Sequence, residues 1–244
     1  SNAEDITHIQ GDVNQFIQMS FEQGFDTIGQ SHDRFFVISD DLGFAKGKIK
    51  NKNTVKVDLN KIEESSAFTF ELDVQKQKKE KYSWAKTVKY DNLFYETGPL
   101  ARALVQNRKQ IKSLHKEYED TILTRVMARV DEIAFLLHQS KELLQSISLN
   151  EASFIEPKIA LKEIDEGFGL GVIEATRGSL QHKVDIKNGL IQRYDVITPT
   201  VWNLGPGNSL DYGVAQKAII GVKSLHEATM ILRSFDVCSV CTTH

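Results

Sequence analysis

The sequence predicts a mixed α/β (α+β) fold for one soluble globular chain. Three features predict it: a helical apolar stripe over residues 121–147, glycines that alternate with apolar residues from residue 167, and an Asn188-Gly189 pair between two alternating runs. The chain has 244 residues, of which 41% are hydrophobic and 26% charged, which is typical of a protein with a sizeable core. A formal net charge of -3 gives no reason to expect a surface that binds nucleic acid.

We divide the chain into four regions. Residues 1–3 are interpreted as an expression-tag scar, residues 4–90 as a region of mixed helices and strands, residues 91–150 as a long-helix layer, and residues 151–244 as strands, a hairpin and closing helices. No apolar run approaches the roughly 20 residues that span a bilayer, and we expect that no signal peptide remains in these residues. We therefore expect a cytoplasmic protein, or one held peripherally at a membrane.

The first region is expected to begin with a helix and to continue with two strands. The apolar spacing and turn residues predict a helix over 5–25 that Gly24 ends, a strand over 34–39, a glycine- and lysine-rich turn over 43–53, a second strand over 66–72 and a solvated charged loop over 76–81.

The second region is predicted to be mainly helical. Pro99 in a first helical turn, with Glu96 nearby, is typical of a helix start. The strongest helix of the chain is expected over 121–147, and its apolar stripe is wide enough to need partners on more than one side. His115 and His138 fall in this region, and we interpret both as surface or boundary histidines rather than ligands.

The last region changes to the period of strands. Gly167, Gly169 and Gly171 alternate with apolar residues, which suggests a strand that other backbone approaches closely. Their spacing is not that of a dinucleotide-binding loop. The run over 184–194 is predicted to be a hairpin around Asn188-Gly189, a turn-rich stretch follows Trp202, and two closing helices are expected over 210–222 and 225–235.

The last nine residues hold both cysteines of the chain, Cys238 and Cys241. A lone Cys-x-x-Cys is compatible with half of a zinc site, a thioredoxin-like redox pair, or two buried thiols. Asp236 and His244 lie beside these cysteines and make a mixed set of soft and hard ligands. This set favours a soft transition metal with a harder cation nearby.

Several motifs share one order and spacing with a known family. They are Tyr82-Ser83-Trp84-x-Lys86; Glu96-x-Gly98-Pro99-Leu100-Ala101-Arg102; Gly169-x-Gly171-x-x-Glu174-Ala175-x-Arg177-Gly178-x-Leu180-x-His182; Ile186-x-x-Gly189-x-Ile191-x-x-Tyr194; Pro199-Thr200-x-Trp202-Asn203; and Asp236-x-Cys238-x-x-Cys241-x-x-His244. Together they resemble the C-terminal half of the large, catalytic subunit of nickel-iron hydrogenases. The resemblance covers nearly the whole chain and is faint before about residue 80. The resemblance implies the C-terminal half of the large-subunit fold, in which long helices pack against small antiparallel sheets and hairpins.

The resemblance implies a nickel-iron centre whose iron carries carbon monoxide and cyanide. Cys238 would be a terminal nickel thiolate, and Cys241 would bridge nickel and iron. Arg177 would hang over the open coordination position and pair with Asp236. An arginine there would assist heterolytic cleavage of dihydrogen, and a thiolate would take the proton.

The resemblance also implies a second group of site residues. Thr200 would hydrogen-bond a cyanide ligand of the iron. The His244 side chain and the Leu180 backbone carbonyl would ligate a magnesium ion, which prefers hard ligands. His182 would either support this site or serve as a hydrogen-bonded structural histidine.

Three departures from the family pattern stand out. Thr176 replaces a usual proline before Arg177, which frees a backbone angle next to the site. Val237 replaces a usual proline in the closing motif, which we interpret as a mark of subtype. The second Cys-x-x-Cys pair, which supplies the other two nickel thiolates in the family, is absent from these 244 residues. Nickel should therefore bind this chain far more weakly than a complete site.

We therefore interpret the chain as a C-terminal fragment of a hydrogenase large subunit, inactive alone. The intact protein would split dihydrogen reversibly and pass electrons to an iron-sulfur small subunit, with maturation proteins and the N-terminal half of the large subunit as further partners, and it would be periplasmic only if exported with the small subunit. We expect an exposed apolar surface, or a homodimer, on the 121–147 helix. The alternative is a non-catalytic, dihydrogen-sensing or binding protein of the same fold.

Overall fold

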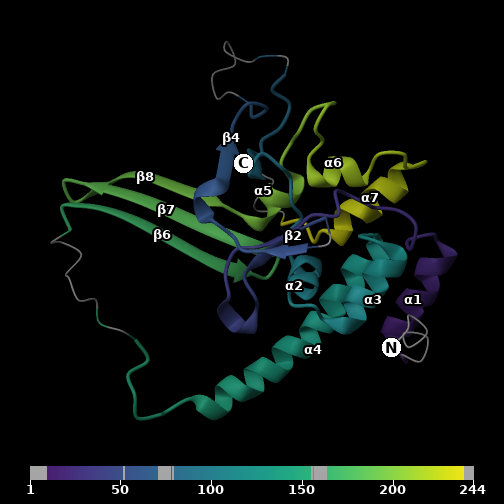
Figure 1. Ribbon diagram of the computed structural model, residues 1–244, viewed down its shortest axis with the longest axis horizontal. Coiled ribbons are helices and arrows are strands. Elements are labelled where there is room, and N and C mark those ends of the chain that lie inside the picture. Colours follow the sequence, from purple (N-terminus) through teal and green to yellow (C-terminus); the bar gives the residue numbers. More distant parts are fainter. Residues whose placement is uncertain are drawn as a thin grey trace.

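The computed structural model describes residues 10–51, 53–70, 78, 80–154, 156 and 164–238. Its helices there are α1 (Asp12–Glu22), α2 (Pro99–Val105), α3 (Lys109–Tyr118), α4 (Ile122–Ser146), α5 (Pro199–Leu204), α6 (Val214–Ala218) and α7 (Leu225–Ser234). Its strands form antiparallel sheets from β1 (Phe35–Val37), β2 (Gly47–Lys50) and β3 (Asn53–Val55), from β4 (Ile62–Ser65) and β5 (Thr87–Tyr90), and from β6 (Glu166–Ala175), β7 (Gly178–Lys187) and β8 (Leu190–Ile197) (Figure 1). The predicted mixed class is confirmed.

The short helix α2 lies in the main core. Each of its residues is buried, and it packs against β1 and the first turns of α4. Pro99 stands at its first position, as the sequence predicted, because proline needs no hydrogen bond there. A second cluster surrounds Trp202, whose ring stacks on Phe36 at 4.7 Å between centroids. These two clusters fix the positions of β1, α2 and α5, against which the loops of the candidate site pack.

Two expectations for the first region were wrong. The stretch over 43–53 is not simply a turn, because Gly47–Lys50 forms β2 and pairs with β1, placing Ile49 opposite Phe35. The strand expected over 66–72 is not formed in its described part. The strand β4 lies just before it, and the alternating aromatics pack locally instead: Phe68 on Tyr82 and Phe70 on Trp84. The helix expected over 5–25 is α1, and residues 1–9 lie outside the described part.

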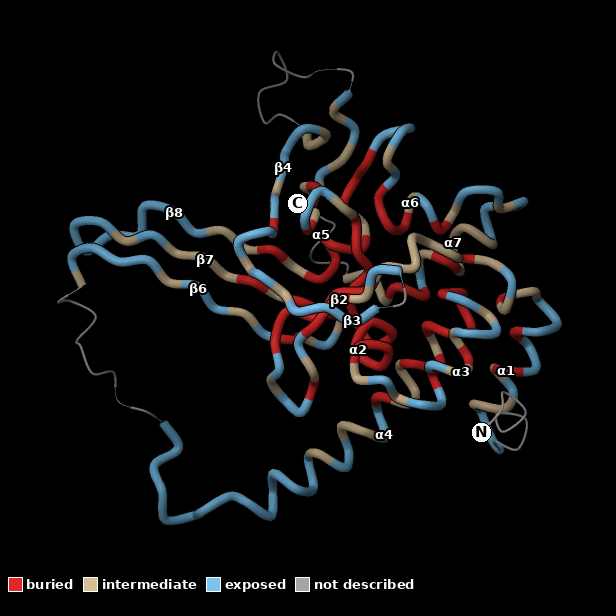
Figure 2. The backbone as a smooth tube through the Cα atoms, viewed as in Figure 1, coloured by how far each residue is buried: buried red, intermediate tan, exposed pale blue. Residues whose placement is uncertain are grey.

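The long helix α4 and the sheet β6–β8 extend away from the body of the molecule (Figure 1). The predicted helix over 121–147 is confirmed and begins after Thr121, whose side chain caps it. Figure 2 shows that burial along α4 falls from its first turns to its outer half. The hairpin predicted over 184–194 is also confirmed, since Asn188 has a φ of 53° and Gly189 a φ of 66° between β7 and β8.

The closing segment is partly as expected. The predicted helix over 225–235 is α7, but the helix expected over 210–222 is only the five residues of α6, where the Gln216 side chain accepts hydrogen bonds from the amides of Gly207 and Gly213. The sequence interpretation missed α5, which begins at Pro199 inside one of the motifs. No helix in the described residues is both long and apolar enough to cross a membrane.

Candidate functional site

The turn between β6 and β7 carries Arg177, and a buried arginine holds this turn from behind. Arg102 of α2 donates hydrogen bonds to the carbonyl oxygens of Ala175 (2.9 Å) and Thr176 (3.0 Å). Its other N–H groups bind the carboxylates of Glu132 (2.7 Å, twice) and Glu174 (2.9 Å). All five guanidinium donors therefore have acceptors. Although Thr176 lacks the fixed angle of proline, its carbonyl is fixed by Arg102.

The ion pairs keep Arg102 charged in the core. Its side chain and that of Glu174 are 1% and 0% exposed. Burial alone would lower the pKa of Arg102, but the hydrogen bonds and charges of Glu132 and Glu174 outweigh burial and raise that pKa. A charge placed so deep is tolerated only when it is paired and fully hydrogen-bonded.

The loop around Gly98 and the turn around Gly178 pack closely against each other next to Arg177. Gly178 has a φ of 131°, and a Cβ atom there would lie 2.4 Å from the Thr97 Oγ1 atom. Gly98 has a φ of 121°, and its Cβ would lie 3.0 Å from the carbonyl oxygen of Arg177. The Ser179 amide donates to Thr97 Oγ1 at 2.7 Å. Glycine is required at Gly178 by both its backbone angle and this close approach.

The helix α5 ties a third motif to these loops. The Asn203 side chain accepts a hydrogen bond from the Thr97 amide and donates one to the Thr97 carbonyl oxygen, each at 3.0 Å. Thr200 lies one turn earlier on α5 and is buried. The structure therefore brings the motifs around Gly98, Arg177 and Thr200 into one hydrogen-bonded unit, although they are distant in the sequence.

The end of α7 is anchored to α4 by two arginines. Arg129 donates to the carbonyl oxygen of Ser234 at 3.0 Å. The guanidinium of Arg125 lies 4.0 Å from the ring centroid of Phe235. Arg125 also forms a buried ion pair with Glu96, both contacts being 2.8 Å. Glu96 was expected to favour the start of α2, but its carboxylate pairs with Arg125 of α4. The contacts of Arg125 and Arg129 fix the end of α7, which Asp236 follows.

Arg177 and Asp236 are brought together across 59 residues of sequence. The Arg177 Nε atom donates to the Asp236 carbonyl oxygen at 2.7 Å and lies 3.3 Å from the Asp236 Oδ2 atom. Asp236 has a φ of 54°, a left-handed conformation that aspartate tolerates. The two side chains are 39% and 37% exposed. Cys238 follows two residues later in the sequence and is half-buried.

The other predicted site residues are placed less completely. Leu180 is half-buried on β7, which packs against α5. The His182 Nδ1 atom lies 2.7 Å from the Tyr194 hydroxyl, which supports the structural interpretation of this histidine. Cys241 and His244 lie outside the described residues. Among the residues that are described, no group of three or more His, Cys, Asp or Glu side chains is arranged to hold a metal.

Sequence reasoning did not assign roles to the residues that support the site. Arg102 is the clearest case, and its signal was a lone charge between Ala101 and Ala103 in an apolar run. A small cavity of about 10 Å³, close to the size of one water, lies between Glu96, Asn203 and Ser234. A larger cavity of about 830 Å³ lies between α3 and β1, and its lining includes none of the predicted site residues.

Comparison with known proteins identifies relatives of this chain. Residues 38–244 match the family model of the nickel-dependent hydrogenases. The Hydrogenase-2 large chain of Escherichia coli (strain K12) is 29% identical over an alignment of 196 residues that covers 67% of this chain and 34% of that protein. The periplasmic NiFeSe hydrogenase large subunit of Desulfomicrobium baculatum is 27% identical over an alignment of 186 residues that covers 67% of this chain and 35% of that protein.

Solved structures show the same fold. A chain of the Ni-Fe-Se hydrogenase from D. vulgaris Hildenborough superposes with a TM-score of 0.80 at 24% identity, over 94% of this chain and 56% of that one. The chain therefore spans about a third of the curated relatives it matches and little more than half of the solved one.

Proposed function

This chain belongs to the family of nickel-dependent hydrogenases, and we propose that it supplies one half of a hydrogenase catalytic centre. The observation that carries the proposal is the contact of Arg177 with Asp236, two residues before Cys238. The intact protein would cleave dihydrogen reversibly to protons and electrons. The relatives reported above are named as hydrogenases, which favours this proposal over the dihydrogen-sensing alternative.

The chemical type of the ligands in this chain fits nickel. The two cysteines of the chain offer soft thiolates, the ligands that such a metal prefers. We propose that the Cys238 and Cys241 thiolates would hold the nickel-iron centre. Two thiolates are half of the four expected from the family, so the remaining ligands must come from polypeptide outside these 244 residues. When bound, a nickel-iron centre would supply the place where dihydrogen is polarised and split.

The residues of this chain would steer that reaction. The Arg177 guanidinium is held by Asp236, two residues before Cys238 in the sequence, and would place a fixed positive charge near that thiol. Such a preorganised charge stabilises negative charge that develops during heterolytic cleavage. The Cys238 Sγ atom would accept the proton. Arg102 holds the turn behind Arg177 and would act as a positioning residue, because it touches only protein groups.

Further ligands and partners belong to the same proposal. Thr200 is buried, as is needed for a hydroxyl that donates to a cyanide on the iron. The Leu180 carbonyl and His244 would hold Mg²⁺. Electrons would leave to an iron-sulfur small subunit, and maturation proteins would insert the metals. A relative is named periplasmic, and a periplasmic location would follow only if this protein is exported with that small subunit.

Nickel binding by the reduced chain tests the proposal. Under anaerobic conditions with a non-thiol reductant, Ni²⁺ should give thiolate-to-nickel charge-transfer absorption, with weak affinity because two thiolates are missing. Cys238→Ser and Cys241→Ser should each weaken these bands, while Ser239→Ala should leave them unchanged. Bands that survive replacement of both cysteines would reject the thiolate assignment. The unassembled chain should show no dihydrogen-dependent dye reduction, and measurable reduction would contradict the half-site.

A further inference from the structure

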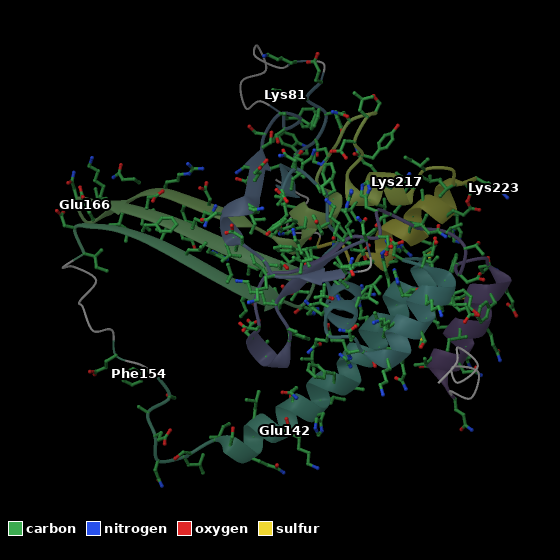
Figure 3. All side chains as sticks on the ribbon, viewed as in Figure 1. Lys81, Glu142, Phe154, Glu166, Lys217 and Lys223 are labelled. Atoms are coloured by element: carbon green, nitrogen blue, oxygen red, sulfur yellow. The ribbon has the colours of Figure 1, made fainter. Side chains whose placement is uncertain are left out.

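The outer half of α4 carries an apolar stripe that no described residue covers. Leu137 is 68% exposed and Leu144 is 71% exposed. Ile133, Leu143 and Ile147 are also exposed. Figure 3 shows Glu142 on this outer half and Glu166 at the far end of the sheet, both away from the body of the molecule. Soluble proteins rarely leave so many large apolar side chains together in water.

The spacing of this stripe is that of a helix-helix seam. Steps of three and four residues alternate without a break along α4 and its C-cap, through Leu123, Val126, Val130, Ile133, Leu137, Ser140, Leu144 and Ile147. This is the heptad pattern of positions that interlock with a neighbouring helix. Leu123 is fully buried in the core, so the seam starts inside this chain and continues outside it. The exposed part, from Ile133 to Ile147, is about 21 Å long at the rise of an α-helix.

The width of the exposed apolar face of α4 distinguishes a second copy of this helix from a partner that packs on two sides. Ala134 and Leu143 flank the seam on its two sides and are exposed. A two-stranded pairing of α4 with a second copy of itself would cover the seam but leave one flank in water. A face of this width is typical of a helix packed by neighbours on two sides, as in a bundle.

The solved relative indicates how much polypeptide is available for this role. This chain superposes on it over 94% of its own length, yet 44% of the relative's chain has no counterpart here, because only 56% is covered. The missing polypeptide is therefore far larger than the 6% of this chain that has no counterpart in the relative.

We propose that the stripe from Ile133 to Ile147 binds a helical polypeptide of the hydrogenase large-subunit type, equivalent to the part of the relatives that these residues lack. The inference rests on the proposed function, because the same polypeptide would bring the missing thiolates to Cys238. The metal centre would then be assembled at an interface whose main apolar contact lies on α4, away from the metal ligands.

Co-expression tests the proposal. The probe is the portion of the D. vulgaris Hildenborough chain that has no counterpart here, expressed with this chain carrying an affinity tag and without added nickel. We expect a 1:1 complex by sedimentation velocity. Leu137→Glu with Leu144→Glu should weaken the complex by about tenfold or more, because charges would enter an apolar seam. His138→Glu with Gln145→Glu is the matched control, since it adds two acidic groups one position further along the same turns, and should leave the complex intact.

Three outcomes would overturn this inference: no complex at all, equal loss with the control pair, or a homodimer of this chain that only the leucine pair dissolves. The last would assign the stripe to a second copy. Urea unfolding of both double variants verifies that they fold, which is expected because all four positions are exposed. A complex that forms but binds no nickel would reject the proposed function and leave this interface standing, so the two failures are distinguishable.

Discussion

Arg102 and Arg177 are two arginines of one hydrogen-bonded unit with opposite surroundings. Arg102 is 1% exposed and uses every guanidinium donor on protein acceptors. Arg177 is 39% exposed and, within the described part of the chain, is bound by Asp236 alone. The two are linked through one turn, because Arg102 donates to the carbonyl oxygen of Thr176, the residue before Arg177. Arg102 therefore stabilises the turn between β6 and β7, and this turn positions Arg177 at the surface.

The difference shows how charge can be divided between stability and chemistry. A buried ion pair has lost its water, so removing one partner leaves the other charge without compensation. A pair that is more than a third exposed is screened by solvent and contributes little to folding. A side chain in the second situation is free to interact with a reacting group. Measurements that separate these two roles therefore test the interpretation of the site.

Replacing Arg102 should have the largest effect. Arg102→Ala would leave Glu132 and Glu174 buried without their partner, and we expect a loss of about 3–5 kcal/mol in the free energy of unfolding. Urea denaturation followed by circular dichroism measures it. Arg177→Ala, measured in parallel, is the control for the loss of one arginine. A loss below about 1 kcal/mol for Arg102→Ala would show that the two arginines do not differ in the way proposed.

Replacing Gly178 should have the next largest effect. The alanine Cβ of Gly178→Ala would meet Thr97 Oγ1 at 2.4 Å, and a φ of 131° is strained for any L side chain. We expect a loss of roughly 2 kcal/mol or more in stability. Gly171→Ala on β6 is the matched control, because no atom lies within 4 Å of its built Cβ. That variant should change stability by less than about 0.5 kcal/mol. Equal effects of the two variants would mean that the two loops are not packed as described.

Local signals explain which elements could be predicted from the sequence. The helix α4 and the hairpin of β7 and β8 follow from an apolar stripe and an Asn-Gly turn, both complete within a short stretch. The strand β2 could not be predicted in this way, because its pairing with β1 depends on residues outside its own stretch. The aromatic alternation of Phe68 and Phe70 resembled a strand but serves ring contacts with Tyr82 and Trp84.

The candidate site divides in the same way. Arg177 and Asp236 were expected to pair on the strength of motifs, and they lie in contact in the structure. Their roles in catalysis, and those of Cys238, Cys241 and His244, remain predictions. The contacts of Arg102 with Ala175 and Thr176 could not be predicted, because they depend on how α2 packs against the end of β6. Sequence patterns predicted the contact of Arg177 with Asp236, whereas tertiary packing determines which residues support it.

Arg177→Ala should have the smallest effect on stability and so tests the other side of the comparison. Because both members of the Arg177–Asp236 pair are more than a third exposed, we expect a loss of less than about 1 kcal/mol in unfolding free energy. The loss should shrink further in 1 M salt, where charges are screened within about 3 Å. Arg193→Ala is the control, because the Arg193 side chain is exposed and pairs with Asp195 on β8. A loss near that of Arg102→Ala would show that Arg177 supports the fold, and the proposal that its charge is reserved for the reaction would then fail.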